Sequence, residues 1–155
     1  MNNRAGWWKG AVVIGLCSLL GGGFLQAGER YTNNNNGTIT DHKSKLVALA
    51  DGNCLQKMTW DEAMAEVGRL ASGKCGLTDG SAAGNWRLPT KRELGILVDW
   101  RKSGKFVALN NDFYWSGTVN EEDSKLAWLI FLATVYIGND LKSDKNMYWP
   151  VRDAH

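Results

Sequence analysis

Apolar residues recur at helical spacing in one clear stretch of this chain, between residues 60 and 71. The positions that share one helical face are Trp60, Ala63, Met64, Val67, Leu70 and Ala71. Thr59 and Glu62 have the spacing of a capping box, and Gly73 follows the stretch. We therefore predict an amphipathic helix from about Trp60 to Ala71.

A second helix is predicted from Thr90, which has the spacing of another capping box with Glu93. Pro89 stands directly before it and prevents the helix from extending backwards. The apolar positions of its buried face are Leu94, Leu97 and Val98. The run Lys102–Gly104 closes this helix.

Short runs rich in aromatic and branched residues flank the helical region and predict β-strands. Before it, residues 29–49 predict a β-hairpin whose turn is the run Asn33–Gly37. The amides of that run are alternatively a sugar or ion site, but turn chemistry explains them better. After the helices, the predicted strands are Tyr114–Val119, Leu126–Leu132, Thr134–Ile137 and Met147–Arg152. A hairpin, two helices and then antiparallel strands make an α+β fold rather than an alternating β/α one.

Residues 1–27 have the organisation of a secretory signal peptide. Arg4 and Lys9 precede an uncharged apolar run that ends at Ala27, which predicts cleavage after Ala27. The alternative is an uncleaved anchor, which the shortness and glycine content of the run disfavour. We therefore predict one exported domain, residues 28–155, in the periplasm, at the cell surface or outside the cell.

Net charge gives little information about partners once the predicted leader is excluded. The chain carries 18 Lys and Arg against 16 Asp and Glu, a formal net charge of +2. Arg4 and Lys9 account for the whole excess, so the mature domain is expected to be neutral. A neutral domain has no general attraction to nucleic acid, and we exclude nucleic acid as a partner.

Export also changes the interpretation of the cysteines. Cys17 lies in the predicted leader, which leaves Cys54 and Cys75 in an oxidising compartment. We predict a disulfide between them, and the alternative is two unrelated buried thiols. Their spacing excludes a Cys-x-x-Cys redox motif, and with only His42 and His155 as imidazoles the set is too sparse for zinc.

The residues available for catalysis are few. His42 lies in the predicted hairpin and His155 is the last residue, so neither is expected to serve a catalytic triad. Paired carboxylates stand at a helix start and in a loop, where the helix dipole and solvation explain them. We predict no catalytic residue, no cofactor and no metal centre. A loop calcium site remains the open alternative, with oxygens from Asn110, Asn111 and Asp112.

Five sequence blocks together resemble a known family. In order they are RYTNNNNGTITD, the block from NCLQKMTWDEAM to NWRLPTKREL, FYWSGT, LAW and YWPVR. Over Arg30–Arg152 the chain resembles the C-terminal domain family of the Legionella collagen-like protein. The resemblance implies a C-type-lectin-like fold, with two helices packed on a small twisted antiparallel sheet and the termini close together. The WRLPT segment is also similar to its counterpart in formylglycine-generating enzymes, whose C-terminal cysteine pair this chain lacks.

Six tryptophans follow the predicted leader: Trp60, Trp86, Trp100, Trp115, Trp128 and Trp149. Stacking on sugar rings is one use of so many aromatic side chains. Five of them, however, occupy family-motif or amphipathic positions and are expected in the core. Trp100 is near the end of its helix and is expected to be the exposed one.

In lectin-like folds of this kind, the C-terminal third commonly supplies the ligand surface. Tyr and Asn side chains there combine rigid area with adaptable hydrogen bonding. The candidate ligand-binding residues are Asn110, Asn111, Asp112, Tyr114, Asn120, Tyr136, Asn139, Asp140, Asn146 and Tyr148. Ordinary loop composition is the competing explanation.

We therefore expect an exported, non-enzymatic binding module whose partner is a glycan or a protein. The alternative is a structural subunit that forms a homo-oligomer, as a trimer or a fibre component. The apolar run Leu126–Ile137, longer than one sheet face needs, motivates this alternative. An enzyme is the third hypothesis, because fold does not determine function. No membrane partner is expected after cleavage of the leader.

Overall fold

Nine elements follow one another along residues 28–154, the part of the chain that the computed structural model describes. Their order is β1 (Tyr31–Asn33), β2 (Thr38–Asp41), β3 (Leu46–Leu49), α1 (Trp60–Gly68), α2 (Ile96–Ser103), β4 (Phe113–Val119), β5 (Leu126–Phe131), β6 (Tyr136–Leu141) and β7 (Val151–Asp153). This order confirms the predicted α+β class. The predicted signal peptide and His155 lie outside the described residues.

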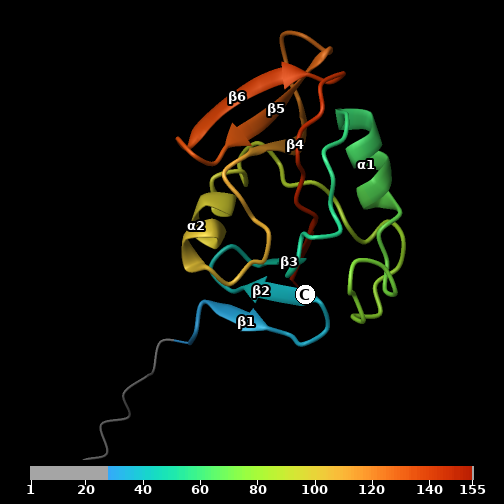
Figure 1. The fold of residues 1–155 in the computed structure, drawn as a ribbon, viewed down its shortest axis with the longest axis vertical. Coiled ribbons are helices and arrows are strands. Elements are labelled where there is room, and N and C mark those ends of the chain that lie inside the picture. Colours follow the sequence, from blue (N-terminus) through green and yellow to red (C-terminus); the bar gives the residue numbers. More distant parts are fainter. Residues whose placement is uncertain (1–27, 155) are drawn as a thin grey trace, which may run out of the picture.

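The strands form two antiparallel sheets at opposite ends of the molecule (Figure 1). The first sheet has the order β1-β2-β3-β7, so the first and last strands of the described chain share it. The second sheet has the order β4-β5-β6. In the view of Figure 1, α2 and α1 lie on either side of the region between the sheets.

The asparagine run is a turn, as predicted. Asn34 donates its backbone N–H to the carbonyl of Thr38 at 3.0 Å, and the Asn36 carboxamide oxygen accepts from the Thr38 hydroxyl at 2.7 Å. The segment 29–49 forms three strands, however, and not a two-stranded hairpin. Asp41 accepts the backbone N–H of Lys43 at 3.0 Å, which makes a second tight turn and returns the chain as β3.

The two helices begin differently from one another. At α1 the predicted capping box is present, because Thr59 and Glu62 each accept from the other's backbone N–H. At the second helix the residues after Thr90 wind with i to i+3 bonds, and α2 begins only at Ile96. The Glu93 carboxylate there also binds the Arg87 guanidinium, at 2.7 and 3.0 Å.

Two strand predictions shift along the sequence. The strand expected at Thr134–Ile137 is β6, from Tyr136 to Leu141, and residues 132–135 form the turn before it. Val135 completes that turn with a left-handed backbone, φ 60°. The strand expected at Met147–Arg152 is reduced to β7, since the residues before it cross the core between the two sheets.

A series of aromatic side chains connects the two sheets through the core. Tyr31 of β1 meets Phe106 edge-on with ring centres 6.0 Å apart. Phe106 meets Trp149 at 6.4 Å, and Trp149 meets Tyr114 of β4 at 6.4 Å. All four side chains are buried, so the sheets share one hydrophobic core.

Trp100 is buried, and the prediction that it is exposed was wrong. Its side chain stacks on Phe106 at 4.8 Å, and its indole N–H donates to Asp41 at 2.8 Å. Asp41 lies on β2, 59 positions earlier, and helical spacing alone does not reveal such a partner. Among the other tryptophans, Trp86, Trp115 and Trp149 are in the core as predicted, whereas Trp60 and Trp128 are half-buried.

Asp41 is itself fully buried and accepts hydrogen bonds from several groups. Arg30 donates through Nε and Nη2 at 3.0 Å each, and Trp100 and the Lys43 backbone add two more. Burial raises the pKa of the Asp41 carboxyl, but these hydrogen bonds, led by those from Arg30, outweigh burial and lower the pKa to about 2. At neutral pH the charged Asp41 carboxylate therefore connects the first sheet to α2 through its hydrogen bond with Trp100.

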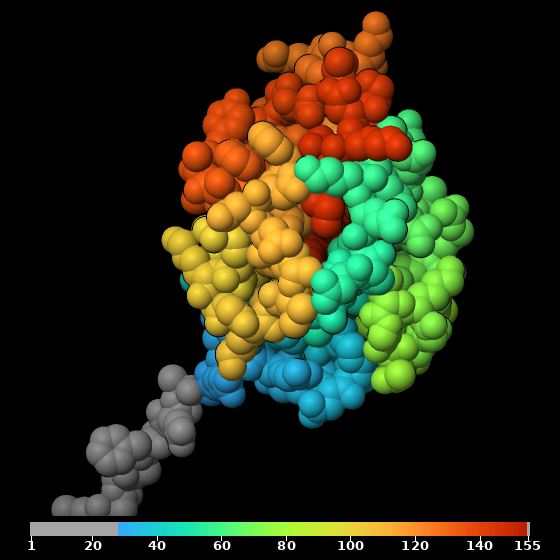
Figure 2. Space-filling view, viewed as in Figure 1, coloured from blue at the N-terminus to red at the C-terminus, as the bar shows by residue number. Residues whose placement is uncertain are grey.

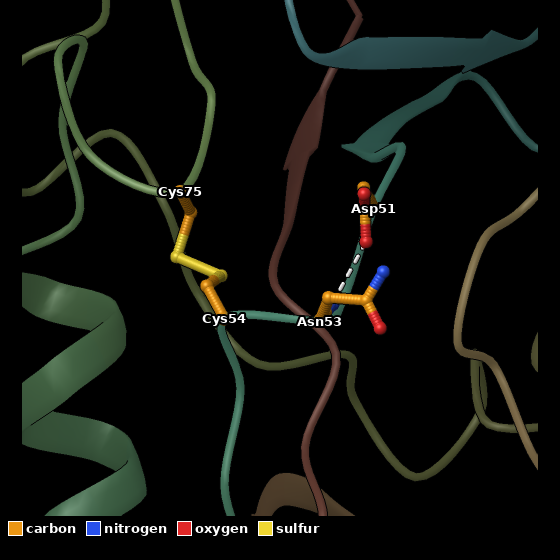
Figure 3. The surroundings of a disulfide bond; sticks show 4 residues. All are labelled: Asp51, Asn53, Cys54 and Cys75. Atoms are coloured by element: carbon orange, nitrogen blue, oxygen red, sulfur yellow. Dashed lines mark hydrogen bonds between the residues drawn. A yellow bond between two sulfur atoms is a disulfide. The ribbon is translucent and has the colours of Figure 1, made fainter.

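The predicted disulfide joins Cys54 to Cys75 (Figure 3). It ties the segment after β3 to the loop after α1. Beside it, Asn53 donates its backbone N–H to Asp51 at 2.8 Å and turns its side chain away from the sulfur atoms (Figure 3). With a sequence separation of 21, the crosslink contributes about 3 kcal/mol by restricting the unfolded chain.

Candidate functional site

Burial decreases from strand to strand across the second sheet. In β4, Tyr114, Trp115 and Ser116 are 0% exposed. Of the residues of β5, three are buried and three are half-buried. In β6, Tyr136 is 62% and Ile137 is 40% exposed. The second sheet therefore projects from the core, with β6 as its outer margin (Figure 1).

Phe113, Phe131 and Tyr136 lie opposite one another at one end of this sheet, one on each strand. We call these three residues the aromatic row. The N–H of Leu132 bonds the carbonyl of Asp112 at 3.1 Å, so the next pair along, Phe113 with Phe131, is a non-hydrogen-bonded pair. Side chains approach most closely in such pairs, and the two rings stack with centres 4.3 Å apart.

The aromatic row continues a face that is otherwise buried. Two positions along the strands, Trp115 and Leu129 share this face and are 0% and 2% exposed. The indole N–H of Trp115 donates to the carbonyl of Met58 at 3.1 Å, which anchors the face. The buried residues Trp115 and Leu129 therefore hold the strands in position, while the rings of the aromatic row remain partly exposed.

The loop before β4 borders the aromatic row on one side. Asp112 binds the Lys57 ammonium through both carboxylate oxygens, at 2.9 and 2.8 Å. Asn110 donates its backbone N–H to the Tyr114 hydroxyl at 2.9 Å. Burial raises the pKa of Tyr114, so this hydroxyl keeps its proton at neutral pH. The Asn110 and Asn111 side chains beside it are exposed.

On the other side of the row, the Tyr136 ring folds along β6 over Gly138. The ring atoms occupy the position that a Cβ at residue 138 would take. Gly138 is consequently buried, although it lies on the most exposed strand of the sheet. A side chain at residue 138 would displace the ring, so glycine at this position lets Tyr136 lie along the strand.

The structure divides the ten predicted ligand-binding residues into three groups. Four belong to the aromatic row or border it: Asn110, Asn111, Asp112 and Tyr136. Three lie toward the opposite end of the second sheet: Asn120, Asn139 and Asp140. Three are buried: Tyr114, Asn146 and Tyr148. The sequence thus predicted part of one candidate surface and a second, separate group.

The three buried residues support the fold, and their placement on the surface was wrong. Tyr114 is 0% exposed, and burial raises the pKa of Tyr148 to about 12. Asn146 pairs its backbone with Met58 in both directions at 3.0 Å and donates its side-chain amide to Asp140 at 3.1 Å. Tyr and Asn are typical of binding loops, but here Tyr114 lies in the buried part of β4, and the segment of Asn146 and Tyr148 crosses the core.

Sequence reasoning missed Phe113 and Phe131. Phe131 lies in the predicted strand Leu126–Leu132, whereas Phe113 directly precedes the predicted strand Tyr114–Val119. The composition of both stretches is typical of a core. Alternation places Phe113 on the same strand face as Trp115. Knowing that this face reaches the surface at Phe113 requires the register of β4 with β5, which one sequence does not supply.

The two half-buried tryptophans are covered by lysines. The Lys91 ammonium lies 3.1 Å from the centre of the Trp128 ring, and the Lys142 ammonium lies 4.3 Å from that of Trp60. The indole N–H groups of both rings are also bonded, to Glu121 and to the Ser116 carbonyl respectively. These rings are therefore engaged within the protein and are weaker candidates for ligand stacking than the aromatic row.

Metal and catalytic candidates are limited in the described part of the chain. Residues 28–154 contain no group of three or more His, Cys, Asp or Glu side chains placed to hold a metal ion. Asp112, from the calcium alternative, is paired with Lys57. His42 lies on the surface, with its Nε2 atom 2.8 Å from the Thr32 hydroxyl. No helix among these residues is long and apolar enough to cross a membrane.

Figure 2 shows a hollow between the segments around residues 50–58 and 105–112, with the C-terminal segment at its floor. The Lys57–Asp112 ion pair and a 3.0 Å hydrogen bond from the Gly52 N–H to the Val107 carbonyl join the two walls of this hollow.

A separate cavity of about 270 Å³ lies beside the disulfide. Its apolar lining includes Leu55, Met58, Val67 and Leu70.

The described residues define a small disulfide-bonded α+β domain with an exposed aromatic row at one sheet margin. A family model, the Lcl C-terminal domain, matches residues 37–152. The chain therefore belongs to the Lcl C-terminal domain family, which confirms the family that the sequence blocks predicted. The match includes both helices and the whole second sheet. No curated protein matches the chain with significant similarity.

Proposed function

We propose that this chain is an exported, non-enzymatic binding module that recognises a glycan or a protein through the aromatic row. The observation that carries this proposal is the exposure of Phe113 and Tyr136, 37% and 62%, on strands anchored in the core. Exposed aromatic rings on a rigid element are a frequent feature of recognition surfaces, because little conformational entropy is lost when they are covered.

The surroundings of the row suit a ligand with both apolar and polar groups. The rings supply flat apolar area for a sugar face or an apolar side chain. The amides of Asn110 and Asn111 and the Lys57–Asp112 pair supply donors and acceptors at the border. Mixed surfaces of this kind gain affinity from the rings and specificity from the polar border.

The disulfide supports the exported location in this proposal. Disulfides persist in oxidising compartments and are rare in the cytosol of most organisms. The Cys54–Cys75 bond agrees with the signal peptide predicted from residues 1–27.

The experiment is a binding screen of the purified chain against a printed glycan array and a panel of immobilised cell-surface proteins. We expect signals that Tyr136→Ser reduces by about tenfold or more, because aromatic residues at such sites carry a large share of the affinity. The matched control is Met64→Gln, which changes an exposed apolar residue on α1. Wild-type signals that Tyr136→Ser and Phe113→Ser leave unchanged would refute this site.

A second candidate function is self-assembly of the chain as a structural subunit. The observation that favours it is the exposure of apolar side chains along and beside β6, where Val135 is 50% and Leu141 is 46% exposed. Light scattering at increasing protein concentration tests it, and a particle mass of one chain at every concentration would exclude it.

A further inference from the structure

The backbone of β6 has one side without a partner strand among the described residues, because β6 is the last strand of its sheet. Lys142 donates its backbone N–H to the Lys125 carbonyl at 2.9 Å, which fixes the phase of the β5–β6 ladder. Inward and outward groups alternate along an antiparallel strand. Tyr136, Gly138 and Asp140 therefore bond toward β5, whereas the residues between and after them, Ile137, Asn139 and Leu141, point their backbone groups outward.

Leu141 is already satisfied within its own turn. Its N–H donates to the Asp140 carboxylate at 2.9 Å, and its carbonyl accepts from the N–H of Asp144 at 2.9 Å. The groups left open on the β6 edge are therefore the N–H and carbonyl of Ile137 and of Asn139. These two donors and two acceptors are arranged symmetrically about Gly138.

The edge also lacks the usual features that prevent strands from pairing. Natural edge strands are commonly protected by lysine, proline, a bulge or a covering segment. Residues 136–141 contain neither lysine nor proline, and their pairing with β5 is regular. Their one charged side chain, Asp140, is held by Asn146 and by its own neighbour Leu141.

We propose that β6 pairs antiparallel with β6 of a second copy of the chain, about a twofold axis at Gly138. In this register Ile137 of each copy lies opposite Asn139 of the other. The two pairs exchange four backbone hydrogen bonds and use every open group of the edge. The result is a continuous six-stranded sheet made of two three-stranded halves.

The side chains in this register are compatible with one another. The turn residue Val135, directly before β6, comes beside Leu141 at the end of the paired strands, and both are exposed apolar residues in the single chain. Tyr136 lies opposite Asp140, so no like charges face each other. At the axis Gly138 faces Gly138, which lets the strands approach closely, and the Tyr136 rings that cover the two glycines meet on one face.

The same geometry argues for a second copy rather than an unrelated peptide. A twofold pairing requires that the strand be complementary to itself, and the open groups, the apolar pair and the glycine all satisfy that requirement at one register. The interface is small, so the dimer is expected to form at high concentration or on a crowded surface. This inference specifies the second candidate function. Tyr136 belongs both to the aromatic row and to this interface, so Ile137, which lies outside the row, is the residue that tests pairing separately from ligand binding.

The experiment measures the mass of the purified chain by sedimentation up to the millimolar range, together with amide hydrogen exchange. We expect a reversible dimer, with slower exchange of the Ile137 and Asn139 amides as concentration rises. Ile137→Lys should weaken dimerisation by about tenfold or more, because a charge at a strand edge opposes pairing. Met64→Lys, an exposed apolar residue on α1, should leave it unchanged.

Two results would overturn this proposal. One is a chain that stays monomeric throughout the concentration range. The other is an oligomer in which the Ile137 and Asn139 amides exchange as fast as in the monomer, since another surface would then mediate contact. Neither result affects the binding screen, whose readout is a ligand signal that depends on Tyr136 and Phe113.

Discussion

The two sheets of this domain use buried and exposed positions in opposite ways. In the first sheet, all four residues of β3 are buried, and a charged carboxylate, Asp41, lies fully buried at the end of β2. In the second sheet, residues of β4 and β5 are fully buried, but burial is lost by β6, whose side chains are mostly exposed. One sheet encloses a polar group, and the other exposes apolar groups.

From this difference we expect the first sheet to contribute mainly to stability and the margin of the second sheet to carry the proposed recognition. The first sheet is connected to α2 by the hydrogen bonds that Asp41 accepts from Arg30 and from Trp100 of α2. The free-energy cost of burying the Asp41 carboxylate is offset only while all of its partners are present. The second sheet is anchored through β4 and exposes its margin, where changes are expected to affect binding more than folding. Variants in the two sheets should therefore have different consequences.

The largest expected effect on stability comes from Asp41→Ala. The change leaves the buried indole N–H of Trp100 without its acceptor and removes both hydrogen bonds from Arg30. Breaking such a buried pair lowers the free energy of unfolding by about 3 to 5 kcal/mol. Urea denaturation measures this loss. As control, Glu122→Ala changes an exposed carboxylate and should stay within about 0.5 kcal/mol of wild type.

A smaller effect is expected from acid. The pKa of Asp41 is lowered from 3.8 to about 2 in the folded chain, so the unfolded state binds this proton at higher pH than the folded state does. The stability it contributes is complete above about pH 4 and is lost as pH falls toward 2, by about 2 kcal/mol in total. Denaturation curves between pH 5 and 2 measure it.

Asp41→Asn serves as the matched variant for the pH experiment. It cannot titrate, so the part of the acid destabilisation that belongs to Asp41 should disappear from its pH profile. A profile as steep as that of wild type would show that other carboxylates cause the acid sensitivity. The comparison isolates the connection between the first sheet and α2, because Asp41 lies on β2 and accepts from Trp100 of α2.

The smallest effect is expected at the turn before β6. Val135 has a left-handed backbone, φ 60°, which a β-branched residue adopts at a cost. Its side chain is 50% exposed, so Val135→Gly relieves strain while losing little packing, and it should stabilise the chain by about 1 kcal/mol. Thermal unfolding measures the gain. In the same turn, Thr134→Gly should give none, and equal effects of the two changes would contradict the strain.

Local chemistry explains what the sequence alone could predict. The capping box of Thr59 and Glu62, the asparagine turn and the disulfide depend on neighbouring residues or on cysteine count, and each is present. The start of α2 was predicted too early: Glu93 accepts the Thr90 backbone N–H at 2.8 Å, but the residues that follow wind with i to i+3 bonds until Ile96.

Most of the errors concern contacts that are distant along the chain, and one concerns a local backbone conformation. Trp100 was expected at the surface because its acceptor, Asp41, belongs to another element. The start of β6 was expected too early because Val135 gives no sequence signal of a left-handed turn. The aromatic row was half found, through Tyr136 and its polar border, because Phe113 and Phe131 become neighbours only through strand register.

The separation of stability from recognition is tested most directly by measuring both properties on two variants. In the array and panel screen, performed below the unfolding transition, Tyr136→Ser should lose the wild-type signals and keep the wild-type free energy of unfolding within about 0.5 kcal/mol. Asp41→Asn should do the reverse, with lowered stability and unchanged signals. Signals that survive in Tyr136→Ser, or that disappear in a folded Asp41→Asn chain, would contradict the assignment of binding to the margin of the second sheet.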